Sequence, residues 1–404
     1  MDHDVAAWHS VLSRIIGGSH LAGGDELVGI LQESLAEVGI AVEMYLVDLA
    51  QEELRALPPG TGAPLDVDST AAGRAYRLTD VVSVDDPPHL WVPVLDGTER
   101  LGVLRMSLPS GADPHDDWLR EQCSLIGGLM GHLVMTKLRY SDVFHVLRRS
   151  RPLSVASELV WQLLPPQTFA RDRLVVSAVM EPFDEVGGDG FDYASDNGHA
   201  TVAVFDAMGH DIAAGLTVAV ALAATRNARR RGLDLLEAAA FADDAITRQA
   251  ELAAHRAFAT ALLADLDLYT GELAFVSAGH PLPVLLRDGR MIKELRGPVR
   301  LPLGMGHLDP QPFQLASEML TPGDRVLLYS DGVTEARSPT GDLFGLERLV
   351  ELIERHHLGG LPAPEALRRI ARAVLDHQRG QLQDDATLLL LEWTTDTPTE
   401  LTAN

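Results

Sequence analysis

Four aspartates stand at the ends of strand-like segments, and their placement could do chemistry. Asp331 follows the apolar run RVLLYS, and the residues after it do not form a return strand. Asp206 ends the run ATVAVFD before a glycine turn, and Asp189 follows two glycines that allow the backbone to turn sharply. Asp384 opens the pair of aspartates that precedes ATLLLL. Side chains at such corners could converge on one point.

Each of these aspartates also has a simpler explanation. A strand-end aspartate most often forms a turn or caps a helix, and Asp96 and Asp288, each followed by glycine between two strand-like runs, predict hairpin turns of this kind. Several carboxylates that do converge would repel one another and raise each other's pKa unless cations neutralised them. Ligation by oxygen alone favours magnesium or manganese over zinc. A shared site would therefore be a divalent metal site.

The composition sets the class of protein. The chain has 404 residues, of which 46% are hydrophobic, so it can form two or three domains with real cores. Its net charge of −25 argues against nucleic acid and anionic membrane as partners. The single Cys123 excludes an intrachain disulfide framework and fits a reducing cytoplasm. The sequence shows neither a signal peptide nor an apolar run of membrane-spanning length, so we expect a cytoplasmic protein.

The second half of the chain predicts antiparallel sheets with helices outside them. Many strand-like segments follow one another, and several are joined by tight turns. Helical stretches come in blocks, at 212–231 and 233–252 between early strands and at 346–356 and 365–377 before the last. This order favours a mixed α/β (α+β) fold over a doubly wound parallel sheet.

The first half predicts a small sheet with helices and a long helix. A helix at 25–38, a strand and a hairpin around Asp96 precede a helix from Trp118 to about Arg149, and a second helical piece spans 154–164. Apolar residues recur every seven positions in the long helix, at Leu119, Ile126, Leu133, Tyr140 and Leu147. This spacing allows a dimer seam or a helix packed on its own domain, and both interpretations stay open.

From about Ser154 to Trp393 the chain resembles the metal-dependent PPM (protein phosphatase 2C-like) serine/threonine phosphatases, in their bacterial SpoIIE/RsbU-like branch. The segments that carry the resemblance occur in family order: EVGGDGFDY, FDAMGHD, LDLYTGELAFVSAGHPLPVLL, LPLG, LLYSDGVTEA and DDATLLLL. The resemblance implies a β-sandwich flanked by helices, with two manganese or magnesium ions that activate water for in-line attack on a phosphate ester.

The resemblance also implies a role for each acidic corner. Asp206 matches the aspartate that bridges both ions, and the backbone carbonyl of Ala207 matches a ligand of one of them. Asp331 and Asp384 match carboxylates on the other ion. Asp189 lies on the Ala207 side and binds directly or through water.

Two positions depart from the family pattern. Gly190 stands where many relatives have an aromatic residue, so we expect looser packing there. Asp211 replaces the last glycine of the family's GHG, and it either caps a helix or alters metal affinity. We expect His210 and His280, which also lie in family motifs, to be structural because neither has a spaced partner.

The front of the chain resembles, more weakly, a GAF-type sensor domain from about Ala22 to Lys137, carried by WVPVLDGTERLGVLRMSL. We therefore expect a sensor domain at 1–117, a helical linker and possible dimer coiled coil at 118–164, a phosphatase domain at 165–395 and a disordered tail at 396–404. An unknown ligand or upstream partner would act on the sensor.

The resemblance implies a phosphoserine/phosphothreonine protein phosphatase acting on a phosphorylated STAS-type anti-anti-sigma protein in a partner-switching pathway. The alternative is a catalytically degenerate scaffold that binds the partner without turnover. A third possibility, a hydrolase of small phosphoesters or nucleotides, lacks the support of a GxxxxGK[ST] phosphate loop.

Overall fold

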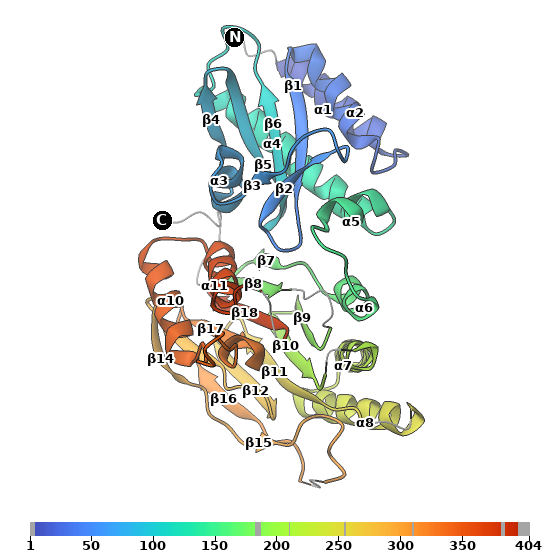
Figure 1. Ribbon diagram of the computed structural model, residues 1–404, viewed down its shortest axis with the longest axis vertical. Coiled ribbons are helices and arrows are strands. Elements are labelled where there is room, and N and C mark those ends of the chain that lie inside the picture. The colour runs from blue at the N-terminus through green and yellow to red at the C-terminus, as the bar shows by residue number, and fades with distance from the viewer. Residues whose placement is uncertain are drawn as a thin grey trace. The chain divides into compact units, whose positions relative to one another are not determined.

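The protein folds into two compact units, Met1–Arg151 and Pro152–Ala403. Our computed structural model describes residues 5–181, 187–209, 211–253, 256–308, 311–380 and 384–394 (Figure 1). His210 and the expected tail at 396–404 lie outside these residues. Within the described residues, no helix has the length and apolar character needed to cross a bilayer.

The first unit contains one antiparallel sheet in the strand order β3-β2-β1-β6-β5-β4. Its strands are β1 (Ala41–Val47), β2 (Glu53–Leu57), β3 (Leu65–Asp66), β4 (Val82–Asp85), β5 (Pro88–Asp96) and β6 (Glu99–Ser107). One face packs against α1 (Val5–Ser19), α2 (Leu27–Leu35), which runs into the short helix η1 (Ala36–Val38), and α4 (Asp117–Leu138). The other face packs against α3 (Ala71–Leu78). The predicted hairpin at Asp96 is confirmed, since β5 and β6 pair up to Asp96 and Glu99.

The single long helix expected at 118–149 is wrong. The chain forms α4 and then α5 (Asp142–Arg148), with a break before Ser141, whose backbone is extended. The break allows α5 to turn back, and its Leu147 joins Leu119 and Ile126 in the core of the unit. Of the two interpretations of the seven-residue spacing, packing on its own domain is thus the one observed for these three residues, and a dimer seam cannot be built from them.

The second unit contains two six-stranded sheets. The first has the order β14-β13-β17-β18-β8-β7, with β7 (Thr168–Arg171), β8 (Leu174–Glu181), β13 (Val284–Arg287), β14 (Arg290–Glu294), β17 (Arg325–Tyr329) and β18 (Ala386–Trp393). The second has the order β15-β12-β11-β10-β9, with β9 (Asp189–Asp196), β10 (His199–Ala207), β11 (Ala259–Asp267), β12 (Glu272–Ala278) and β15 (Val299–Arg300), while β16 (Ala316–Met319) also pairs with β12.

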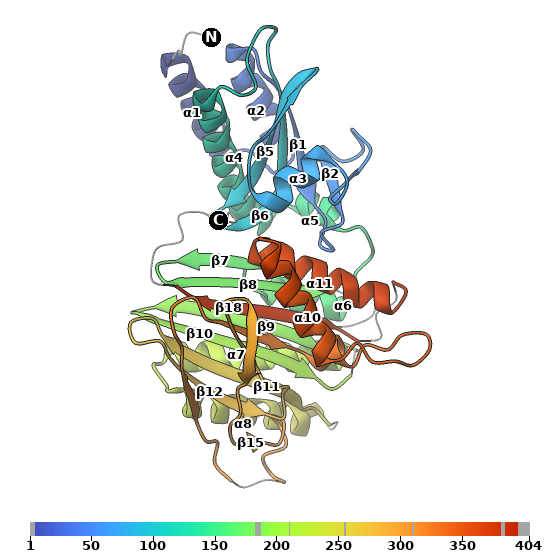
Figure 2. The same ribbon diagram turned by 90° about the vertical axis from the view of Figure 1, so that its left-hand side faces the viewer.

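The two sheets stack face to face, and helices cover their outer faces (Figure 2). One hydrophobic core joins them, with Val176 and Leu389 from the first sheet and Phe205 and Leu262 from the second. The helices α10 (Leu346–Leu358) and α11 (Ala363–His377) pack on the first sheet, while α6 (Val155–Leu163), α7 (Ile212–Arg230) and α8 (Leu235–Ala253) lie on the opposite side. The predicted antiparallel sandwich with outer helices is confirmed.

Candidate metal centre

The first half of the site lies on two neighbouring strands of the second sheet. Asp206 near the end of β10 is directly opposite Asp189 at the start of β9. Residues paired in this way in an antiparallel ladder direct their side chains to the same face. The backbone N–H of Ala207 donates to the carbonyl of Gly188 at 2.7 Å, which fixes the turn that carries Asp189. The two carboxylates are therefore held close together by strand pairing.

The second half comes from the ends of two strands in the first sheet. β17 ends at Tyr329, Ser330 continues in an extended conformation, and Asp331 begins the one-turn helix α9 (Asp331–Thr334). Asp384 lies just before β18, the neighbour of β17. The N–H of Ser330 donates to the carbonyl of Thr387 at 3.0 Å, so pairing of the two strands continues up to the site.

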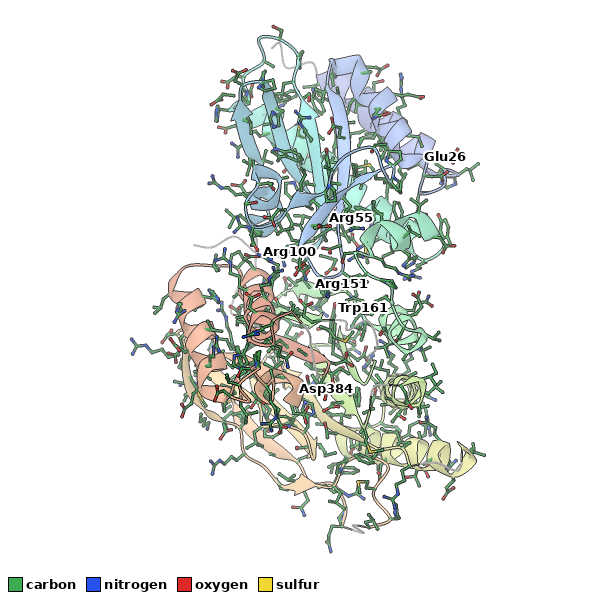
Figure 3. The ribbon with its side chains drawn as sticks, viewed as in Figure 1. Glu26, Arg55, Arg100, Arg151, Trp161 and Asp384 are labelled. Carbon is green, nitrogen blue, oxygen red and sulfur yellow. The ribbon has the colours of Figure 1, made fainter. Side chains whose placement is uncertain are left out.

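The two sheets meet at these corners. The side chain of Asp385 accepts hydrogen bonds from the N–H groups of Gly188 at 2.7 Å and Asp189 at 3.1 Å. The side chain of Asp206 lies close to Asp331, and the charges of Asp331 and Asp384 act on it. The structure thus brings together all four of the aspartates predicted from sequence. Figure 3 labels Asp384, one of the four.

The carboxylates strongly disturb one another. Burial, then the charges of Asp206 and Asp385, raises the pKa of Asp189 well above its ordinary value. Burial, followed by the charges of Asp331 and Asp384, raises the pKa of Asp206 to about 8. The pKa of Asp331 is raised by burial and by Asp384. Carboxylates crowded in a poorly solvated place take up protons unless another positive charge neutralises them.

The donor set fits divalent cations. The Oδ2 atom of Asp189 is buried and has no hydrogen-bond partner in the described structure, which is costly for a carboxylate unless a cation or proton satisfies it. Every side chain gathered here offers oxygen, the donor that magnesium and manganese prefer. Across the described ranges, no group of three or more His, Cys, Asp or Glu side chains is already arranged around one metal position.

Asp385 is the residue of this site that sequence reasoning missed. The available signal was the pair of adjacent aspartates before β18, of which we expected only Asp384 to act. The side chain of Asp385 is 3% exposed and reaches across to the other sheet.

The two departures from the family pattern have local explanations. Asp211 caps α7, because its Oδ1 accepts from the N–H groups of Ala213 at 2.9 Å and Ala214 at 3.1 Å, so the cap interpretation is confirmed. The looser packing expected at Gly190 is wrong. A Cβ atom there would lie 2.5 Å from Cγ1 of Val218, since the branched side chain on α7 fills the space that an aromatic residue would need.

His280 lies beside the centre, just after β12 of the second sheet. Its Nδ1 atom lies 2.7 Å from the hydroxyl of Thr260, which is paired with Asp206 across β10 and β11. Burial lowers the pKa of His280 to about 3, so the imidazole is neutral at physiological pH. These contacts agree with the structural role expected from sequence.

Residues 196–394 match the family model of Stage II sporulation protein E (SpoIIE). This region is similar to SpoIIE domains. The match includes Asp206, Asp331 and Asp384 and begins just after Asp189. The resemblance stated from the sequence motifs is therefore confirmed for this part of the chain.

Three proteins are similar to parts of this chain. The chain is 25% identical over 244 residues to the phosphoserine phosphatase RsbU of Bacillus subtilis, covering 59% of this chain and 69% of RsbU. It is 32% identical over 136 residues to protein IcfG of Synechocystis, covering 33% of this chain but only 20% of IcfG. A solved structure of the RsbU and RsbW domains of Rv1364c from Mycobacterium tuberculosis is 25% identical, with a TM-score of 0.47, covering 57% of this chain and 64% of that one.

Proposed function

We propose that the SpoIIE-like domain is a metal-dependent phosphoserine/phosphothreonine protein phosphatase. The observation that carries this proposal is the clustering of Asp189, Asp206, Asp331 and Asp384 from two sheets, where burial and the charges of Asp331 and Asp384 raise the pKa of Asp206 to about 8. The relative RsbU bears the name phosphoserine phosphatase, which supports the same reaction class.

The residues of this cluster would hold two divalent cations, Mn²⁺ or Mg²⁺. We infer that Asp206, between the two halves of the site, would take part in holding both, and that the carbonyl of Ala207 and the carboxylate of Asp189 would help to hold one of them. Asp331 and Asp384 would help to hold the other. Bound there, such cations supply an activated water and neutralise the charge of a phosphate ester.

Burial of these carboxylates contributes to the chemistry. A poorly solvated cluster strengthens each charge interaction within it. The strand pairing of Asp206 with Asp189 and of β17 with β18 holds the ligand backbones without reorganisation during a reaction.

We further propose a phosphorylated STAS-type anti-anti-sigma protein as substrate in a partner-switching pathway. The first unit would be a GAF-like sensor for an unknown ligand or upstream partner, and residues 118–164 would transmit its state to a phosphatase domain at 165–395. A homodimer and a cytoplasmic location remain parts of this proposal. The scaffold alternative loses one support, because Asp211 is used as a helix cap.

Phosphate release from a phosphoserine peptide and from p-nitrophenyl phosphate tests the proposal, with manganese titrated in and a chelator added afterwards. Turnover should require metal, and Asp206→Asn and Asp331→Asn should remove nearly all of it. Asp96→Asn, at a hairpin turn in the first unit, is the control and should leave the rate unchanged. Metal-independent turnover, or Asp206→Asn activity within a few-fold of the original, would contradict the assignment. Hydrolysis of p-nitrophenyl phosphate without hydrolysis of the phosphopeptide would favour a hydrolase of small phosphoesters or nucleotides.

A further inference from the structure

Asp385 has an unusual set of contacts for a carboxylate next to a metal-binding residue. Its Oδ2 atom accepts two backbone hydrogen bonds, from Gly188 at 2.7 Å and from Asp189 at 3.1 Å. These donors lie at the start of β9 in one sheet, whereas Asp385 lies just before β18 in the other. The side chain therefore spans the two halves of the acidic site.

The backbone of Asp385 is equally engaged. Its carbonyl oxygen accepts from the hydroxyl of Ser330 at 3.4 Å, one residue before Asp331. The same oxygen lies against Gly332, where an added Cβ atom would be 1.9 Å away. The carbonyl of Asp385 thus contacts the residues next to Asp331. The side chain of Asp385 contacts the backbone at Asp189.

The hydrogen bonds that Asp385 accepts are linked to the backbone of Ala207. Gly188, which donates to Asp385, accepts with its own carbonyl from the N–H of Ala207 at 2.7 Å. This turn is tightly packed, since a Cβ atom at Gly188 would lie 2.9 Å from the carbonyl oxygen of Ala207. A shift of the Asp385 carboxylate would therefore move both Asp189 and Ala207.

A fifth carboxylate at this site needs a reason. Asp385 is 3% exposed, and its negative charge adds to the repulsion felt by Asp189 and Asp206. Burying a charge among like charges is costly, but two charge-assisted hydrogen bonds to backbone N–H groups offset part of that cost. The contacts that justify its presence are those to the backbone of the opposite sheet.

We propose that Asp385 is a positioning residue that fixes the distance between the metal-binding corners of the two sheets by clamping the backbone of Gly188 and Asp189. It acts through these hydrogen bonds and not as a ligand of a cation. The inference rests on the proposed metal centre, and it assigns to the second aspartate of the pair a task different from that of Asp384.

Three substitutions in the full chain separate position from charge. Asp385→Asn keeps an oxygen where the two N–H groups can reach it but removes the charge. Asp385→Glu keeps the charge but moves the oxygens by one methylene, and Asp385→Ala removes both. Mn²⁺ dissociation constants measured by calorimetry are the main readout, because they do not depend on catalysis.

We expect Asp385→Ala and Asp385→Glu to weaken Mn²⁺ binding by about 10- to 100-fold, the usual effect of losing a group that orients metal ligands. Asp385→Asn should stay within about 3-fold of the original, since second-sphere contacts act through geometry. Asparagine binding Mn²⁺ as poorly as alanine would overturn the proposal, because charge or direct ligation would then explain the residue. Unchanged binding in all three variants would overturn it as well. If the alanine and glutamate variants fail to fold, weakened Mn²⁺ binding in the asparagine variant would still overturn the proposal.

Asp324→Ala is the matched control. Asp324 is also fully buried, accepts from the N–H of Thr321 at 2.7 Å and pairs with Arg287, but it precedes β17 at the end opposite Asp331. It should lower the melting temperature and leave Mn²⁺ affinity unchanged. Weakened Mn²⁺ binding in Asp324→Ala equal to that in Asp385→Ala would overturn a specific role for Asp385. An original protein that binds Mn²⁺ but releases no phosphate would refute the phosphatase proposal while leaving this inference standing.

Discussion

Replacing Gly332 by alanine should damage the site without removing any proposed ligand. Gly332 is buried at the second position of α9, directly after Asp331. A Cβ atom there would lie 1.9 Å from the carbonyl oxygen of Asp385 and 3.4 Å from Cβ of Asp384. The oxygen belongs to the backbone and cannot rotate away. Real Cβ contacts essentially never fall below 3.0 Å, so the two loops must separate by roughly 1 Å.

That separation can be converted into a rate. A displacement of about 1 Å in a catalytic arrangement can cost on the order of 100-fold, or about 2.7 kcal/mol of barrier. Overpacking should also cost about 1–3 kcal/mol of unfolding free energy. We therefore expect kcat/KM for a phosphoserine peptide at saturating manganese to fall by about two orders of magnitude, with the folded state retained.

Gly359→Ala is the control for the Gly332 experiment. Gly359 follows α10 with a φ of −78°, which alanine adopts freely, and the nearest atom to an added Cβ is 3.4 Å away. Its activity should be unchanged. A Gly332→Ala protein with kcat/KM within about five-fold of the original would refute the reasoning, since the loops would then tolerate separation without loss of geometry.

Three further outcomes follow from the contacts of the second unit. In chelator, the unfolding free energy should fall as pH rises from about 4 to 8, because the folded state binds a proton at Asp206, whose pKa is raised to about 8, that the unfolded state has released. Urea titrations across that range check this, and Asp206→Asn should make the dependence shallower, while Asp189 and Asp331, whose pKa values are also raised, retain part of it. Arg226→Ala should cost about 3 kcal/mol by urea unfolding, because Asp192 is buried and keeps only its second partner Arg229. A cost below about 1 kcal/mol would show that Arg229 suffices. Leu389→Ala should cost about 2–5 kcal/mol, since that side chain lies fully buried between the sheets, and an unchanged melting temperature would contradict this packing.

Much of the sandwich could be read from the sequence because its central strands carry a strong signal. β8 is buried along its whole length, and β18 is buried at all but one position. Such strands are nearly continuous apolar runs, which few other structures explain. Asp206 and Asp331 were visible for the same reason, since a carboxylate at the end of an apolar run has no role in the core.

The break between α4 and α5 illustrates what local pattern could not reveal. Every residue from Trp118 to Arg149 is compatible with a helix, and no proline intervenes. The structure stops α4 at Leu138, where buried Lys137 donates to the carbonyls of Ser19 and Ala22. These partners are more than a hundred residues away along the chain, so a pattern confined to one segment does not contain the reason for the break.

The two neighbouring aspartates before β18 show the same limit within the site. Successive side chains of an extended chain point to opposite faces, so sequence alone suggests that only one of Asp384 and Asp385 can reach a given point. The structure uses both because the partners differ in kind: Asp384 acts on the carboxylate of Asp206, whereas Asp385 binds backbone N–H groups of the opposite sheet. Backbone donors belong to every residue type except proline and leave no mark on a sequence. A residue that recognises them therefore cannot be identified until the chain is folded.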